Sequence, residues 1–449
     1  MPSGGTKRAP RKRATRESGR AIVDAILSAA ALLLERDGLE GLTTNALARI
    51  AGVSVGSVYQ YYPNKLAIVA ELARRLERTG SDFAAGQLEW MHEASVRDAA
   101  WRIAGLVTDP AFGSVRVRRT LLREVPRGWI HEVTKETDTT LEALLAGFLR
   151  LRREELRPAE PDRLAFVVYH AFDGVVEGAI LLEPELLVRG ELHEELFHLA
   201  WRYVAPDGAS LAAPGIARSD GAPPGDASAD AAARARLDTE PSRRRRIEGT
   251  ASSTARGRGT RAAILAAAAR VLAQDGLAGA SARCIAREAG VAAGALYHHF
   301  RNVESVVSAI GLDEELRMRA AMADAALRLD ELESRDAIES LVRIYAAPGD
   351  EARRRRAVLF REVPRRWAEQ ASAETSRAAR RQLSAALGSR GDRVRAGDHE
   401  RMAFVACRAV EGVVEAASLR GLHDAELDSL VPDLTELVWR YVRADPASG

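Results

Sequence analysis

Apolar residues recur along most of this chain at the three- and four-residue spacing that places them on one face of an α-helix. No stretch shows the alternation of apolar and polar positions that is typical of a half-buried strand. The pattern is clearest near the start of each half of the chain, at Ile22, Ile26, Ala29, Ala30 and Leu33 and again at Ile264, Leu265, Ala268 and Leu272. We therefore expect an all-α fold.

The helical pattern occurs twice, and the second copy follows the first at a constant distance of 238 residues. The matching segments are Asp37-Gly38-Leu39 with Asp275-Gly276-Leu277, Arg123-Glu124-Val125-Pro126-Arg127 with Arg361-Glu362-Val363-Pro364-Arg365, and Trp201-Arg202-Tyr203-Val204 with Trp439-Arg440-Tyr441-Val442. Because one register holds from the start of each copy to its end, the chain is a tandem duplication of a whole unit rather than a short-repeat array.

We expect six segments from this pattern. They are a basic disordered arm (1–17), a first small helical domain (18–78), a first larger helical domain (79–205), a disordered linker (206–257), a second small helical domain with a degenerate pattern (258–316) and a second larger helical domain (317–445). The linker is assigned because its Ala, Pro, Gly, Ser and Arg residues lack helical periodicity.

Composition and charge narrow the class of protein. The 449 residues carry a net charge of +2, but arginines and lysines gather in the N-terminal arm and in Arg243–Arg246, as suits contact with phosphate backbones. No window approaches 18 uncharged apolar residues and no signal peptide begins the chain, so we expect a cytoplasmic protein without a membrane span. There is no glycine-rich phosphate loop, nucleophile elbow or cluster of metal ligands, which predicts neither an enzyme, nor a cofactor, nor a metal.

The segment after the first helix has the signals of two short helices joined by a tight turn. Gly38 is suited to end the first helix, and Thr43 to cap the next one. Gly52 would end that short helix, and Ser54 would cap the following one. This arrangement predicts a helix-turn-helix, whose second helix lies in the major groove of DNA.

Residues 41–65 resemble the N-terminal domain of TetR-family repressors. The resemblance lies in an ordered set at fixed spacing: Thr-Thr, Ala-Gly-Val, Gly-x-x-Tyr-x-x-aromatic and Asn-Lys. It covers about 60 residues in each copy; beyond them only the general helical plan matches. The resemblance implies a ligand-responsive repressor that binds a double-stranded DNA operator and a small-molecule effector. In it, 18–78 and 258–316 are helix-turn-helix DNA-binding domains, and 79–205 and 317–445 are regulatory domains.

The resemblance also implies roles for residues of the first copy. Hydroxyls of Thr43 and Thr44 would contact phosphates, and so would the phenols of Tyr59 and Tyr61 and the ammonium of Lys65. The residues expected to face base edges are Asn45, Val55, Ser57 and Gln60. Val58 and Tyr62 are expected to pack in the core of the domain.

The second copy departs from the pattern, since Ala282 stands where Thr44 does and Val303 where Lys65 does. The residues left to contact DNA are Ser281, Arg283, Tyr297, His298, His299 and Arg301, of which Arg283 suits a bidentate contact with guanine. The second reader is therefore expected to contribute affinity more than sequence discrimination.

The regulatory halves carry two sets of polar residues on single helical faces: His170, Asp173 and Glu177, and the matching Arg408, Glu411 and Glu415. Each set forms either a polar seam between helices or the polar end of a ligand pocket. The expected interface helices are 162–182 with 191–205, and 399–420 with 425–443, where small residues such as Gly174 and Gly412 allow close approach. The Arg-Glu-Val-Pro-Arg segments are read as helix ends that carry a local ion pair, in preference to a ligand-binding role.

Two assemblies and one alternative function stay open at this point. The two copies form either a pseudo-dimer within one chain or a homodimer of chains with four readers. The alternative function is a partner-binding regulatory protein in which the second DNA-binding domain has decayed.

Overall fold

The computed structural model describes residues 17–86, 90–91, 93–109, 115–215, 255–328, 334–346, 350–367, 369–422 and 424–445. Within these ranges the regular elements are helices, and the β-structure is a single isolated bridge between Val394 and Arg443. The expected all-α fold is confirmed. The predicted arm up to residue 16 and linker residues 216–254 lie outside the described residues.

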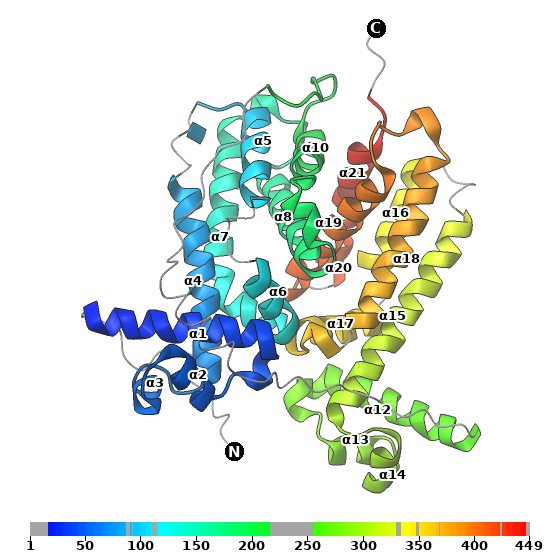
Figure 1. The fold of residues 1–449 in the computed structure, drawn as a ribbon. Helices are drawn as coiled ribbons and strands as arrows, with labels where there is room; N and C mark the ends of the chain where they lie inside the picture. The colour runs from blue at the N-terminus through cyan, green and yellow to red at the C-terminus, as the bar shows by residue number, and fades with distance from the viewer. Residues whose placement is uncertain are drawn as a thin grey trace.

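The helices form two units of the same plan (Figure 1). Unit 1 (residues 17–215) contains α1 (Glu17–Gly41), α2 (Thr44–Ala51), α3 (Val55–Tyr61), α4 (Lys65–Gly86), α5 (Val96–Val107), α6 (Val115–Glu124), α7 (Arg127–Leu151), η2 (Arg153–Glu155), α8 (Pro161–Leu182), α9 (Pro184–Val188) and α10 (Leu192–Val204). Unit 2 (residues 255–445) contains α12 (Ala255–Gly279), α13 (Ala282–Glu288), α14 (Ala293–His299), α15 (Val303–Arg328), α16 (Ser334–Ala346), α17 (Asp350–Glu362), η3 (Arg365–Trp367), α18 (Glu369–Gly388), η4 (Gly391–Arg393), α19 (His399–Leu419), α20 (Asp424–Asp428) and α21 (Val431–Val442).

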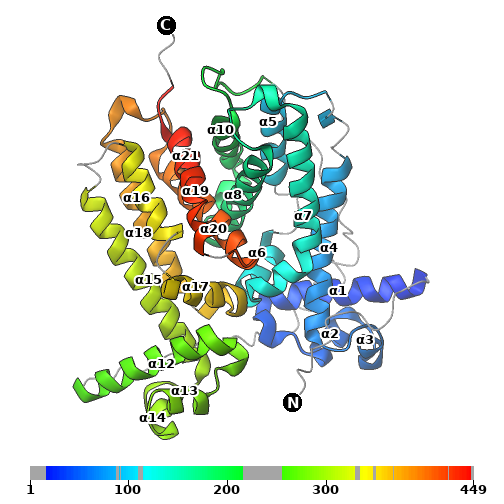
Figure 2. The same ribbon diagram turned by 180° about the vertical axis from the view of Figure 1, so that it is seen from behind.

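Three apolar cores organise these helices. Head 1, made of α1 to α3 and the start of α4, encloses one core, which α6 completes with residues such as Leu121. Head 2, made of α12 to α14 and the start of α15, encloses another, to which Val363 at the end of α17 contributes. The third core is continuous through the remaining helices of both units, including Phe197 of α10 and Leu437 of α21. The two heads lie at the same end of the molecule, opposite the C-terminus (Figures 1 and 2).

The units meet most closely where α8 crosses α19. A Cβ atom added to Gly174 would lie 2.6 Å from the Cα of Gly412, and one added to Gly412 would lie 2.6 Å from the Cα of Gly174. The two helices therefore touch backbone to backbone, which only glycine permits at these positions. Both helices fall within the ranges expected above to form an interface.

Polar contacts between the units come in matched pairs. The Tyr203 hydroxyl of unit 1 donates to Asp433 of unit 2 at 3.2 Å, and the Tyr441 hydroxyl of unit 2 donates to Glu195 of unit 1 at 2.6 Å. Tyr441 follows Tyr203 by 238 residues and Asp433 follows Glu195 by 238 residues, so the two bonds join equivalent positions in opposite directions. The same surface patch on each unit thus contacts its equivalent on the other, which is the geometry of an isologous interface.

Two observations in this part of the molecule bear on the sequence expectations about a membrane span and about the linker. Among the described helices, α8 is long and apolar enough to cross a membrane, although 83% of its most apolar window is buried inside the protein. Its hydrophobicity is explained by its place between its own unit and α19. Residues 206–215, expected to be part of a disordered linker, are held on unit 1 by bonds from Trp201 Nε1 to the Ser210 carbonyl and from Arg97 to the Ala212 carbonyl.

Candidate nucleic-acid interface and regulatory cavity

The geometry of head 1 follows from local capping residues. Gly38 has a φ of 69° and a ψ of −168°, which breaks the helical conformation near the end of α1, and Gly52 has the left-handed conformation, with a φ of 69° and a ψ of 32°, directly after α2. The Thr43 hydroxyl accepts from the Ala46 amide at 3.2 Å, and the Ser54 hydroxyl accepts from the Ser57 amide at 3.0 Å. Each predicted stop and cap is confirmed, so these residues fix the angle between α2 and α3.

Most of the residues expected to contact DNA share one exposed surface of head 1. Asn45, Val55, Tyr59, Gln60 and Lys65 are exposed, and Thr43, Thr44 and Ser57 are partly exposed beside them. The Thr44 hydroxyl lies 3.4 Å from the Tyr59 hydroxyl, which joins α2 to α3 at this surface. We call these eight residues the reading surface of head 1.

Tyr61 is placed differently from this group. It is 6% exposed and belongs to the core of head 1, together with Val58 and Tyr62, each 2% exposed. Tyr61 follows the exposed Tyr59 by two positions and so lies on nearly the opposite side of the short helix, because successive helical positions turn by about 100°. We therefore leave Tyr61 out of the reading surface.

Head 2 repeats this design with fewer polar groups. The Ser281 hydroxyl caps α13 by accepting from the Cys284 amide at 3.2 Å, but Ala292 gives α14 no side-chain cap. Arg283, Tyr297, His298 and Arg301 are exposed on the expected surface, whereas His299 is 9% exposed and stands where Tyr61 does in head 1. Both heads thus turn the same helical position inward.

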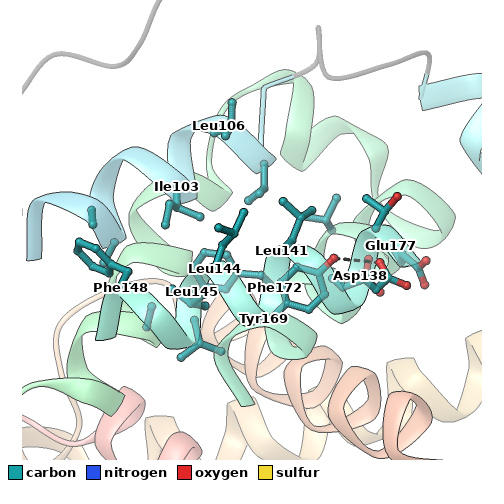
Figure 3. A pocket seen from close by; sticks show the side chains of 18 of the residues that line it. Ile103, Leu106, Asp138, Leu141, Leu144, Leu145, Phe148, Tyr169, Phe172 and Glu177 are labelled. Carbon is teal, nitrogen blue, oxygen red and sulfur yellow. Dashed lines mark hydrogen bonds between the residues drawn. The ribbon is translucent and has the colours of Figure 1, made fainter. Parts of the chain in front are cut away.

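The regulatory part of unit 1 encloses a cavity of about 290 Å³ between α5, α7, α8 and the start of α4. Its wall is mostly apolar and includes the aromatic rings of Trp90, Phe148, Tyr169 and Phe172. Figure 3 shows Phe148 and Ile103 towards one end and Asp138 and Glu177 at the other. We call this the unit-1 cavity.

Its polar end is acidic. The charged residues of the wall are three carboxylates, Asp138, Asp173 and Glu177, and one guanidinium, Arg118. Asp138 accepts from the Tyr169 hydroxyl at 2.9 Å and from the Thr134 hydroxyl at 2.8 Å. Of the two readings of the His170–Asp173–Glu177 face, a seam or a pocket end, the structure supports both: Asp173 and Glu177 line the cavity, while His170 bonds Glu142 and lies 3.1 Å from Arg420 of unit 2.

The corresponding space in unit 2 is smaller and differently charged. The unit-2 cavity measures about 130 Å³ and is lined by Arg408, Glu411 and Glu415 of the predicted set. Arg408 stands where His170 does in unit 1, and its side chain contacts Gly178 and pairs with Glu411. Arginines from both units also line this space, among them Arg127 of unit 1.

The Arg-Glu-Val-Pro-Arg segments do end α6 and α17, as expected. Glu124 faces head 1, where it accepts from the Leu39 amide at 3.5 Å beside the Gly38 turn, and Glu362 bonds the Leu277 amide in the same way. Arg127 points the other way, into the joint between the units. Each segment thus reaches a head with its glutamate and the joint with its second arginine.

Four buried or half-buried side chains form a charge cluster at that joint: Arg127, Glu177, Arg365 and Glu415. Arg127 bonds Glu177 and, at 2.7 Å, Glu415; Arg365 bonds Glu415 at 2.6 Å. Burial raises the pKa of Glu177 to about 7, because Arg127, which also bonds Glu415, offsets only part of the effect of burial. Burial also acts upward on Glu415, but Arg127 and Arg365 outweigh it and hold its pKa at about 2. Glu177 is thus the weakly held carboxylate of the cluster.

Sequence reasoning missed the residues whose partners lie far along the chain. Arg127 and Glu415 are separated by 288 positions, and Asp138 meets Tyr169 only through the packing of α7 on α8. The one available signal was the repetition of Arg-Glu-Val-Pro-Arg in both copies, which marked the segment without revealing its contacts.

Comparison with known proteins identifies two domain types, each found twice. A model described as bacterial regulatory proteins, tetR family, matches residues 26–72 and 264–310. A second, described as tetracyclin repressor-like, C-terminal domain, matches residues 107–203 and 334–441. Each N-terminal match falls on a head, and each C-terminal match on the regulatory part that follows it.

Individual relatives match one part of the chain at a time. The nucleoid occlusion factor SlmA of Actinobacillus pleuropneumoniae is 32% identical over 68 residues, which is 15% of this chain and 32% of that protein, so the match spans about a third of these relatives. Among solved structures, a transcriptional regulator from Rhodococcus sp. Rha1 is 21% identical and covers 41% of this chain and 99% of its own, with a TM-score of 0.35. NalD of Pseudomonas aeruginosa is 22% identical and covers 42% of this chain and 100% of its own, with a TM-score of 0.34.

Proposed function

Because the chain belongs to the TetR family of bacterial transcriptional regulators, we propose that it is a ligand-responsive repressor whose two heads bind one DNA operator as an intrachain pseudo-dimer. The observation that carries the proposal is the joint between the units. Equivalent residues contact each other there in both directions, as two separate subunits do in a symmetric dimer.

The one-chain assembly is proposed because the joint covers the surface through which a unit would otherwise bind a second chain. Gly174 and Gly412 bring α8 and α19 into backbone contact, and a continuous apolar core surrounds them. A second chain finds this surface already covered by the first chain's own other half. The competing assembly, a dimer of chains with four heads, would need a different surface.

The unequal heads predict an asymmetric operator. A symmetric dimer with identical recognition helices reads two equal half-sites. Here α3 presents Val55, Ser57 and Gln60, whereas α14 presents alanines at the positions of Val55 and Ser57. The half-site under head 1 is therefore the better defined of the two.

Selection of bound sequences from a random pool of duplex DNA tests the reading surface. We expect one half-site with high information content and a second with less. Ser57→Ala should alter base preference in the first half-site only. A perfect palindrome with equal information in both halves contradicts the unequal readers, and binding through head 1 alone supports the partner-binding alternative.

Measurement of mass in solution tests the assembly. The pseudo-dimer is expected as a 48.6 kDa species, free and on a single operator. A species of twice that mass at working concentration contradicts it and supports the four-headed dimer.

Response to a ligand is proposed from the connections between cavity and heads. Glu177 lines the unit-1 cavity and bonds Arg127, and the same segment carries Glu124, which holds the Gly38 turn of head 1. A ligand that binds one arrangement of this chain of contacts more tightly shifts the angle of the heads and so lowers operator affinity.

A further inference from the structure

The two cavities of the chain differ in the charge of their walls as well as in size. The unit-1 wall combines four aromatic rings with three carboxylates and one guanidinium. In unit 2 the position of Asp138 is Ser376, that of Tyr169 is Cys407 and that of Phe148 is Ala386. Unit 2 keeps Glu411 and Glu415 at the positions of Asp173 and Glu177, but it lacks the third carboxylate and these two rings, and five arginines line its cavity.

We propose that the unit-1 cavity binds one apolar molecule carrying a single positive charge, whose cation lies at the acidic end beside Asp138 and Glu177. This inference deepens the proposed function, because it names the class of effector and assigns one effector site to each chain.

The geometry of Asp138 favours a cation there. Its two hydrogen-bond partners are the neutral hydroxyls of Thr134 and Tyr169, which orient the carboxylate without neutralising its charge. Asp173 lines the same end and its side chain is 46% exposed, so the acidic end is reachable from solvent. Aromatic faces add attraction for an ammonium group, since the ring quadrupole is negative above the ring.

The apolar part of the ligand fits the rest of the cavity. Ile103, Leu145 and Phe148 line it away from the carboxylates (Figure 3). Pockets of this kind obtain affinity from apolar burial and orientation from a few polar groups. The cavity thus suits an elongated molecule with its charge at one end.

The position of the cation also gives a route to the heads. Glu177 is shared between the cavity wall and Arg127, so a ligand cation competes with Arg127 for the same carboxylate. Arg127 released from Glu177 keeps Glu415 as a partner. Its segment then rearranges, and Glu124 of the same segment transmits the change to head 1.

Calorimetry on the full chain with three matched probes tests the inference. The probes are the phenylhexyl-trimethylammonium ion, the neutral phenylhexanol and the anionic phenylhexanoate. We expect the cation to bind with one site per chain and at least about tenfold more tightly than the alcohol, and the carboxylate to bind least. Equal binding of all three, or two equivalent cation sites per chain, overturns the inference.

Variants separate the acidic end from general charge. Asp138→Asn is expected to weaken the cation about tenfold and to leave phenylhexanol unchanged. Glu136→Gln is the matched control, because this exposed carboxylate lies on α7 outside the cavity wall and its removal changes the net charge equally. Tyr169→Phe, which keeps the charge of Asp138 but removes one orienting hydroxyl, should weaken the cation less than Asp138→Asn does.

Two further outcomes would count against the inference or against the proposed function separately. If Asp138→Asn weakens all three probes equally with the helix content intact, the carboxylate only shapes the cavity and the cation site is wrong. Operator binding by the ligand-free protein is measured in parallel: operator binding without any preference for the cation refutes this inference alone, whereas cation binding without operator binding refutes the proposed repressor.

Discussion

Replacement of Gly174 by alanine tests whether the joint between the units holds the molecule together. The added methyl carbon would lie 2.5 Å from the Arg408 carbonyl oxygen and 2.6 Å from the Cα of Gly412. Ordinary contact begins near 3.4 Å, so α8 and α19 must separate by about 0.8 Å. The obstacle is backbone on the opposite helix, which a change of side-chain rotamer does not relieve.

The expected magnitude follows from two opposing effects. Overpacking of a closely packed site costs about 1–3 kcal/mol, and a contact with rigid backbone belongs at the upper end of that range. Alanine gains roughly 1 kcal/mol over glycine within a helix. We therefore expect Gly174→Ala to lower the free energy of unfolding by about 2 kcal/mol.

Gly147→Ala is the matched control. Gly147 lies within α7, and a Cβ atom added to it meets nothing within 4 Å. The control should be unchanged or more stable by up to about 1 kcal/mol. Urea unfolding followed by circular dichroism measures both variants, and small-angle scattering reports separation of the units. If Gly174→Ala is as stable as Gly147→Ala, the close crossing of α8 and α19 is not the native arrangement.

Four further variants each remove one charged side chain. Burial raises the pKa of Glu177 from its ordinary 4.5 to about 7, so the folded chain binds this proton more tightly than the unfolded chain does. Ionisation of Glu177 should therefore lower the free energy of unfolding by up to about 3 kcal/mol between pH 5 and pH 8. Glu177→Gln should abolish that part of the pH dependence of the urea midpoint. Burial lowers the pKa of His198 to about 4, so this residue adds stability as the pH rises from about 4 to 6.5, opposite to the effect of Glu177. His198 is present in both the original chain and the Glu177→Gln variant, so its contribution cancels when their pH dependences are compared. Lys65→Ala should reduce the slope of log affinity against log salt by about one, as measured by titration of operator DNA; an unchanged slope removes Lys65 from the phosphate contacts. Glu124→Gln should weaken operator binding severalfold without loss of helix, and footprinting should show the loss under head 1, whereas Glu362→Gln should affect the other half-site. Equal loss in both half-sites for either variant contradicts the role of each glutamate in orienting the head that it contacts.

The parts of the structure that sequence predicted are those decided within a few residues. Gly38 and Gly52 need a left-handed backbone conformation, and Thr43 and Ser54 bond amides three positions ahead. Such contacts depend on local spacing alone. The repeat likewise required only the comparison of the chain with itself, and it predicted two units of one plan.

The parts that sequence did not predict depend on which helices meet. Tyr61 and His299 looked like surface residues because their neighbours are, yet each turns into the core of its head. Arg127 finds Glu177 and Glu415 only after α7, α8 and α19 have assembled. A helical pattern tells which face of a helix is apolar but not which charged residues the assembled helices bring together.

The repeat also allows the two kinds of function in this chain to be separated. Arg127 and Glu177 have identical counterparts in Arg365 and Glu415, and all four take part in one cluster between the units. A change in any one of them leaves a buried charge without compensation in a cluster that both copies share, and such a loss is costly. Cavity residues carry no such constraint, because Asp138 bonds only within unit 1, and its counterpart position is free to be serine. Duplication within one chain therefore preserves the joint in both copies while the cavities diverge: unit 1 has the Asp138 carboxylate and its partner Tyr169, whereas unit 2 has Ser376 and Cys407 at these positions. This difference supports the proposed single ligand site, which acts on both heads through the shared joint.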